Sequence, residues 1–104
     1  MSKTAKQKLR NIHPGEVLRE EFPLPLGITQ YRLAKELGVT EARISAICSG
    51  KRGVTADTAL RLAVFFGTTS GFWLGLQAGY DTEEAAKELS GELAQTHRFE
   101  PLAA

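Results

Sequence analysis

The chain has 104 residues, a length that fits one domain with a modest helical core and not two. Its formal net charge of +1 does not by itself indicate a nucleic-acid partner. It has one cysteine, which excludes an internal disulfide, and neither a signal-peptide pattern nor a run of about 20 apolar residues, so we expect a soluble, cytoplasmic protein without membrane contact.

The charges are unevenly distributed along the chain. Residues 1–10 carry four bases and no acid, residues 29–61 carry six bases and three acids, and residues 81–104 carry six acids and two bases. This distribution fits a protein whose two ends meet different partners; the alternative is that both ends are solvated tails, and for the arm alone the two interpretations are equally favoured. We expect residues 1–11 to form a flexible basic arm that can reach phosphates or a neighbouring DNA groove.

A first helix is expected to begin at Pro14, because proline's missing N–H costs nothing at the first helical position. His13 lies where the chemistry of a helix start explains it. Val17, Leu18 and Phe22 provide a core face, and Pro23 and Pro25 end the helix. The connecting loop should be anchored by Leu24, Leu26 and Ile28.

Residues 29–49 predict two short helices joined by a three-residue turn. Thr29 and Thr40 are the expected N-caps, and Gly38 ends the first helix because glycine accepts a left-handed backbone. Such a helix-turn-helix places its second helix in the DNA major groove; an ordinary helical hairpin is the alternative. The residues expected to be buried between the helices are Leu33, Ala34, Leu37, Ile44 and Ile47.

The exposed side of the second helix should carry only small side chains, opposite Ile44 and Ile47. A helix backbone can then approach the groove floor, where alanine contacts thymine methyls and serine bonds to base edges. Glu41 and Arg43 flank this side: Glu41 can accept from cytosine, and Arg43 can bond either a guanine or a phosphate. The small residues are Ala42, Ser45, Ala46 and Ser49.

Phosphate contacts are expected from the segments that precede and follow the second helix in the chain. Gln30 begins the first helix of the motif, where the helix dipole favours an anion. Lys51 and Arg52 lie in a mobile loop between two glycines. Because one such domain offers few phosphate contacts, useful affinity implies a homodimer that reads two half-sites about 34 Å apart.

Two further helices should complete a five-helix domain over residues 12–80. Thr55 opens one that Gly67 ends, and Ser70 caps a short one that Gly79 ends. The aromatic residues of the short helix can form a ligand box, but core packing is the favoured interpretation. The expected core residues are Ala56, Ala59, Leu60, Ala63 and Val64 in the first helix and Phe72, Trp73, Leu74 and Leu76 in the second.

Residues 81–104 are expected to form a C-terminal helix and an acidic tail. Asp81 and Glu84 have the spacing of a capping box. The apolar stripe of this sixth helix can dock onto another surface or pack back on its own domain. The stripe consists of Ala85, Ala86, Leu89 and Leu93.

These elements predict an all-α protein, a compact five-helix repressor-like helix-turn-helix domain with an added C-terminal helix. His13, Cys48 and His97 lack metal-ligand spacing and any nucleophile-base pattern. Cys48 follows buried Ile47 and is interpreted as a packing residue. We therefore expect no enzymatic activity, no cofactor and no metal.

Four segments together are more specific than the helix-turn-helix alone. They are HPGEVLREEF (13–22), ITQYRLAKELGV (28–39), RISAICSGKRGVTADTALRLA (43–63) and FFGTTSGFWLGLQAGYD (65–81). In this order they resemble the HigA family of antitoxins, within the phage-repressor-like group. The resemblance covers about residues 12–81.

The resemblance implies the antitoxin of a type II toxin-antitoxin module. Such a protein binds and neutralises a messenger-cleaving toxin and, as a dimer on double-stranded operator DNA, represses their shared promoter. The alternative is a stand-alone helix-turn-helix transcriptional regulator without a toxin. The resemblance implies DNA contacts for Gln30, Thr40, Glu41, Ala42, Arg43, Ala46, Lys51 and Arg52, to which helix geometry adds Ser45.

Overall fold

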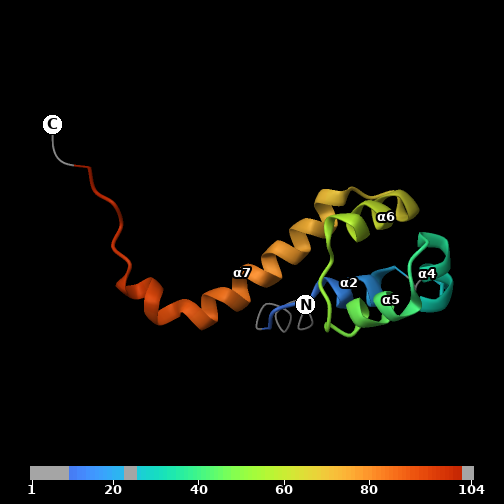
Figure 1. Ribbon diagram of the computed structural model, residues 1–104, viewed down its shortest axis with the longest axis horizontal. Helices are drawn as coiled ribbons and strands as arrows, with labels where there is room; N and C mark the ends of the chain where they lie inside the picture. The colour runs from blue at the N-terminus through green and yellow to red at the C-terminus, as the bar shows by residue number, and fades with distance from the viewer. Residues whose placement is uncertain (1–9, 23–25, 102–104) are drawn as a thin grey trace, which may run out of the picture.

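The computed structural model describes residues 10–22 and 26–101, and within these ranges it contains helices and no strands (Figure 1). The helices are α2 (Pro14–Glu21), α4 (Gln30–Leu37), α5 (Glu41–Cys48), α6 (Ala56–Phe66) and α7 (Ser70–Gln95). The predicted all-α fold is confirmed. Residues 1–9 of the predicted basic arm, together with Pro23, Leu24 and Pro25, lie outside the described residues. Leu26, predicted to anchor the connecting loop, is 60% exposed, so that prediction is wrong.

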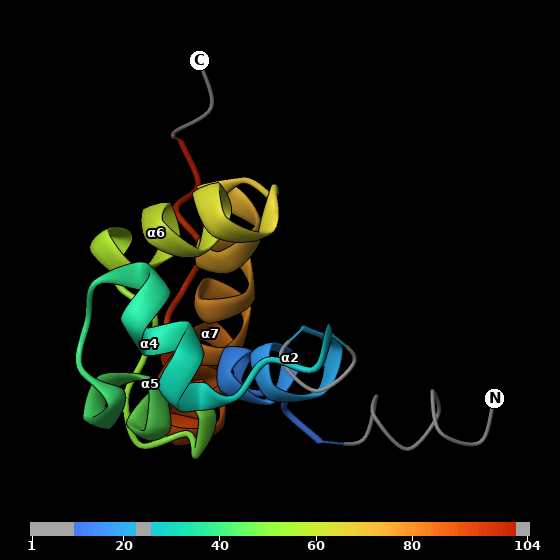
Figure 2. The same cartoon turned by 90° about the vertical axis from the view of Figure 1, so that its right-hand side faces the viewer.

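Helices α4 and α5 lie at the end of the molecule away from the C-terminal half of α7 (Figures 1 and 2). They pack against each other, and α2 packs on α5 while α6 packs on α4 and α7. Within the described ranges, no helix combines the length and the apolar character needed to cross a bilayer. The arrangement leaves the predicted DNA-reading motif at one tip of the fold.

The helix starts follow from the capping residues. His13 is the N-cap of α2, and its Nδ1 accepts a 2.9 Å hydrogen bond from the amide of Gly15. At the end of α4, Gly38 has φ 74°, a left-handed conformation that glycine adopts without a Cβ clash. Ser70, predicted as a cap, is instead the first residue of α7. Threonine N-caps, each accepting from the amide three residues later, begin the other four helices at Thr29, Thr40, Thr55 and Thr69.

One hydrophobic core joins all five described helices. The Trp73 indole N–H donates a 2.8 Å hydrogen bond to Oγ1 of Thr68, so this large side chain is buried without an unpaired donor. The ring of Phe22 lies 5.0 Å from that of Trp73 and 4.7 Å from that of Phe66. This packing favours the core interpretation for Trp73. The prediction is wrong for Phe72 and Leu74, which are 41% and 36% exposed because they lie on either side of the single buried face that Trp73 occupies. The largest fully buried apolar side chains in the helices include Leu18, Leu33, Ile44, Ile47, Leu62 and Trp73.

Helix α2 crosses the C-terminal end of α5 at very short range. A Cβ atom added to Gly15 would lie 1.6 Å from the carbonyl oxygen of Ile47, so only glycine fits there. One turn further along α2, Nη1 of Arg19 donates a 3.1 Å hydrogen bond to the carbonyl of Cys48. The start of α2, with the sequence HPGE, thus packs against the C-terminal end of α5 and holds it in place.

The prediction of which residues of α6 face the core is wrong for part of the helix. Leu60 and Val64 are 58% and 85% exposed, whereas Leu62 is fully buried. Two faces of α6 are apolar in sequence, and the neighbours decide between them: α4 and α7 cover the face with Ala59 and Leu62. Ala56 is likewise exposed.

The predicted break at Gly79 is also wrong, because α7 runs without interruption for 26 residues and crosses the boundary predicted between residues 80 and 81. A glycine inside a helix costs only about 1 kcal/mol relative to alanine. Neighbouring contacts hold the helix there: Asp81, predicted as a cap, accepts a 2.9 Å hydrogen bond from Nε2 of Gln77. Asn11 also donates to the carbonyl oxygen of Tyr80 at 2.8 Å.

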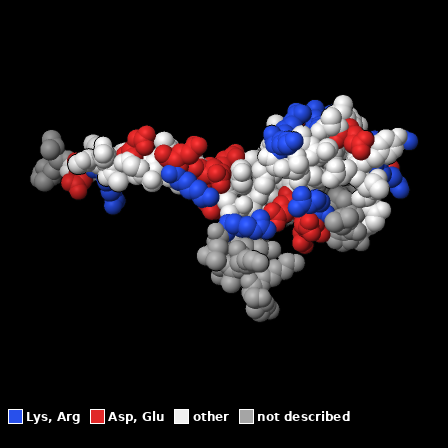
Figure 3. All heavy atoms as spheres, turned by 90° about the horizontal axis from the view of Figure 1, so that it is seen from below, with Lys and Arg blue, Asp and Glu red and all other residues white. Residues whose placement is uncertain are grey.

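After Glu84, every residue of α7 is exposed, and this part of the helix projects from the rest of the protein (Figure 1). Leu89 and Leu93 are 43% and 54% exposed. The alternative that the stripe packs back on its own domain is therefore wrong. Acidic side chains, with basic ones among them, lie along this projecting half (Figure 3).

Candidate nucleic-acid interface

The second motif helix, α5, turns one apolar side inward and a side of small residues outward. Ile44 and Ile47 are fully buried. Ala42 and Ser45 are exposed on the outer side, and Ala46 is half-buried. No bulky side chain stands on the outer face formed by these three residues, which suits close approach of the helix backbone to a groove floor.

The residue preceding α5 fixes where the helix begins. Oγ1 of Thr40 accepts a 3.1 Å hydrogen bond from the amide of Arg43, which satisfies one of the free N–H groups of the first turn. Glu41 is the exposed first residue of the helix. Gln30, half-buried, is the first residue of α4, which packs directly on α5. These predicted site residues thus occupy the N-terminal ends of the two motif helices.

The basic loop after α5 is held at both ends. The amides of Lys51 and Arg52 donate to the carbonyl oxygen of Ala46 at 2.9 and 3.2 Å. At the other end, the amide of Val54 donates a 2.7 Å hydrogen bond to Oε1 of Gln77 in α7. The loop was predicted to be mobile, but its backbone is tied to α5 and α7. The side chains of its two bases are exposed.

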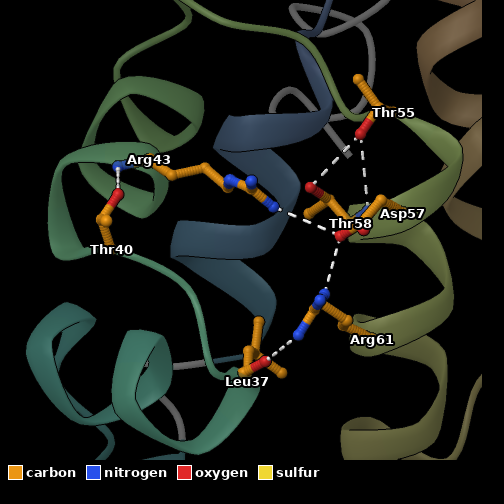
Figure 4. A network of polar contacts seen from close by, with 7 residues as sticks. All are labelled: Leu37, Thr40, Arg43, Thr55, Asp57, Thr58 and Arg61. Carbon is orange, nitrogen blue, oxygen red and sulfur yellow. Dashed lines mark hydrogen bonds and ion pairs between the residues drawn. The ribbon is translucent and has the colours of Figure 1, made fainter.

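The side chain of Arg43 turns from α5 toward the first turn of α6 (Figure 4). Its Nη1 donates to Oδ1 of Asp57 at 3.3 Å, and the side chain is 27% exposed. Nε of Arg61 donates to the same carboxylate oxygen at 2.7 Å, and Nη1 of Arg61 donates to the carbonyl oxygen of Leu37 at 2.7 Å. Arg43 is therefore held by a side chain on another helix, whereas the Thr40 side chain bonds only within the first turn of its own helix.

The two guanidinium groups change the acidity of Asp57. The hydrogen bond from Arg61 is the main cause that lowers the pKa of this carboxyl group, and Arg43 adds to the effect. Sequence reasoning missed Asp57 and Arg61 as parts of the interface. The i, i+4 spacing of these two residues on one helix is a signal that predicts their pairing. Nothing local in the sequence predicts the contact with Arg43, 14 positions earlier.

Two of the residues considered for catalysis, Cys48 and His13, serve the fold, and His97 lies exposed after the end of α7. Cys48 is 3% exposed, and burial raises the pKa of its thiol, which suits packing and not nucleophilic attack. His13 caps α2, its ring lies 4.8 Å from that of Tyr80, and burial lowers its pKa. Within the described part of the chain, no three His, Cys, Asp or Glu side chains are grouped so that they could hold a metal ion.

Comparison with known proteins agrees with this geometry. A family model described as helix-turn-helix matches residues 19–74. Virulence-associated protein I of Dichelobacter nodosus is 46% identical over 80% of this chain and 77% of its own length. Antitoxin HigA-1 of Vibrio cholerae is 42% identical over 73% of this chain and 71% of its own. The structure of Pseudomonas aeruginosa antitoxin HigA with the higBA promoter matches with a TM-score of 0.80 and 37% identity, over 90% of this chain and 100% of that one.

Proposed function

Because this chain belongs to the HigA family of helix-turn-helix antitoxins, we propose that it is the antitoxin of a type II toxin-antitoxin module. In this role it represses its own operon by sequence-specific binding to double-stranded operator DNA and neutralises a cognate toxin. It acts by binding and not by catalysis.

The observation that carries the DNA-binding proposal is the outer side of α5. Ala42 and Ser45 are exposed there, and exposed Lys51 and Arg52 follow in a loop whose backbone is hydrogen-bonded to the same helix. The small residues let the helix enter the major groove while the two bases meet phosphates. The proposed contact set is Gln30, Thr40, Glu41, Ala42, Arg43, Ser45, Ala46, Lys51 and Arg52.

Fluorescence anisotropy with the DNA upstream of the protein's own gene tests this proposal. Binding should be about a thousandfold or more tighter than to a scrambled duplex of the same length. Ala42→Glu should abolish the preference, because it places a charged, bulky group on the groove-facing side. Ala94→Glu on the exposed end of α7 is the matched control and should bind as the wild type does. Equal affinity of the wild type for both duplexes would contradict the proposal.

We assign homodimer formation to the stripe of α7 with Leu89 and Leu93. Both side chains are exposed in the single chain. The part of α7 after Glu84 has no buried residue, and a short helical segment without tertiary packing is only marginally stable in water. The stripe lies at the end of the molecule away from α4 and α5 (Figure 1), so pairing there leaves the DNA-reading side of both copies free. Two copies supply the second half-site contact that one domain lacks.

Sedimentation equilibrium measures this directly. Leu93→Asp should weaken the dimer, whereas Gln95→Asp, which adds the same charge on the opposite side of the helix, should not. A Leu93→Asp protein that remains dimeric but fails to capture its toxin would assign the stripe to the toxin instead.

Neutralisation of a toxin is tested with the neighbouring gene. The product of an adjoining open reading frame should co-purify with this protein, and its toxicity in cells should disappear on co-expression. If no adjoining gene product binds, while operator binding persists, the protein is a stand-alone regulator.

A further inference from the structure

One oxygen of Asp57 accepts hydrogen bonds from two guanidinium groups, and the two bonds are unequal. Arg61 donates at 2.7 Å and Arg43 at 3.3 Å. Arg61 also donates to the carbonyl oxygen of Leu37, at the end of α4 just before the motif turn. Figure 4 shows these contacts as a chain from α4 through α6 to α5.

Arg61 anchors the carboxylate. It lies one turn after Asp57 on α6 and is fixed at a second point by Leu37, so it restricts where the carboxylate can be. The Thr55 cap, which begins α6 two residues earlier, fixes the backbone of Asp57 as well. Asp57 is thus a restrained acceptor beside the first turn of α5.

Arg43 donates to the Asp57 carboxylate through only one nitrogen of its guanidinium group. Among the described residues, only Nη1 has a hydrogen-bond partner, so the edge with Nε and Nη2 stays available. The first residues of a recognition helix are the ones that reach base edges, and Arg43 is the third residue of α5. A free edge of two N–H groups matches the two acceptors of guanine in the major groove.

We propose that Asp57 is a specificity-determining positioning residue, which orients Arg43 so that the free edge of its guanidinium group reads a guanine in the operator. The inference deepens the proposed DNA-binding function and rests on it. Arginine has many rotamers, and fixing one of them before binding removes an ordering cost that the complex would otherwise bear. The carboxylate also repels phosphates, so it opposes non-specific binding while it supports the specific contact.

The test compares Asp57→Asn with the wild type on the operator and on a scrambled duplex over a range of salt concentrations. Asparagine keeps an acceptor for Arg61 but loses the charge. Operator affinity should fall roughly two- to tenfold, the range that follows from an ordering cost of about 0.5–1.5 kcal/mol. Affinity for the scrambled duplex should instead rise. Glu88→Gln, which removes a charge from the exposed part of α7, is the control and should not lower operator affinity.

A double-mutant cycle separates positioning from a structural role. In an Arg43→Ala background, Asp57→Asn should no longer weaken operator binding, because the residue that it orients is absent. An equal loss in both backgrounds would overturn the proposal, as would an Arg43→Ala protein with undiminished operator affinity. Failure of the wild type to prefer its operator would instead contradict the proposed DNA-binding function. Circular dichroism melting of each variant confirms that folded proteins are compared.

Discussion

The amide of Val54 and the side chain of Gln77, 23 positions apart in the chain, are joined by a 2.7 Å hydrogen bond. Gly53 lies against the same carboxamide, where an added Cβ would be 3.0 Å from its atoms. Helix α7 therefore determines where the basic loop ends, and through the loop it affects how Lys51 and Arg52, the proposed phosphate contacts, are positioned.

Gln77→Ala should loosen this loop and weaken operator binding. The substitution leaves the amide of Val54, a residue that is 4% exposed, without its acceptor, which costs about 1–3 kcal/mol. Part of that loss should appear as lower operator affinity, because the loop is no longer held in one conformation. Anisotropy titration and thermal melting measure the two effects. Gln95→Ala, at the exposed end of the same helix, should change neither.

Gly15→Ala should be among the most destabilising single methyl additions in the chain. The new Cβ would overlap the carbonyl oxygen of Ile47, and both partners are backbone, so α2 and α5 must separate. Overpacking of this kind typically costs about 1–3 kcal/mol, and more where the backbone cannot move. Urea unfolding followed by the fluorescence of Trp73, which is fully buried, gives the free energy of unfolding.

Gly91→Ala is the matched control for that experiment. An added Cβ there meets no atom within 4 Å, so the substitution should stabilise the helix by about 0.5–1 kcal/mol. Circular dichroism is the suitable readout, since this part of α7 is far from the tryptophan. A Gly15→Ala protein as stable as the wild type would show that the two helices can move apart freely.

The His13 cap predicts a pH dependence of stability. Burial lowers the pKa of His13 from 6.5, with Asp81 opposing the shift in part, and the cap bond requires a neutral Nδ1 acceptor. The folded protein therefore binds fewer protons than the unfolded chain, so this stability is fully present above pH 6.5. It is lost as the pH falls from that value through the folded-state pKa.

His13→Asn tests the prediction, because asparagine caps a helix without titrating in this range. Melting temperatures of the wild type should fall between pH 6.5 and the range in which carboxyl groups titrate, while those of the variant stay level. Parallel profiles for the two proteins would assign the pH dependence to other groups.

Lys51→Ala should lower affinity for all DNA sequences alike. The side chain is exposed and is proposed to meet a phosphate, so its removal should also reduce the salt dependence, the slope of log K against log salt, by about 1. Lys87→Ala in α7 removes the same charge elsewhere and should leave the slope unchanged. A loss confined to the operator would show that Lys51 reads a base.

The elements that local chemistry determines could be predicted from the sequence. Thr29, Thr40 and Gly38 set the ends of α4 and α5 by capping and backbone conformation, and Ile44 with Ile47 marks the buried side of α5. Each of these signals acts within a few residues, so no knowledge of the tertiary fold is needed.

The predictions from sequence are wrong or incomplete at positions where contacts with other helices determine the structure. Two apolar faces compete on α6, and only the positions of α4 and α7 select Leu62 over Leu60. Gly79 weakens a helix locally, yet contacts of Gln77 and Tyr80 carry α7 through it. The partner of Arg43 lies on a different helix, and no periodicity in the sequence links the two.

The projecting half of α7 has an evolutionary consequence. Its residues after Glu84 are exposed and lie at the opposite end of the molecule from α5 (Figure 1). Substitutions at two sites this far apart, without shared neighbours, usually have additive effects. Under the proposed assignment, substitutions on the outer side of α5 can change the operator that is read without disturbing the pairing stripe of α7, so a duplicated copy can acquire a new promoter while it keeps the same mode of pairing.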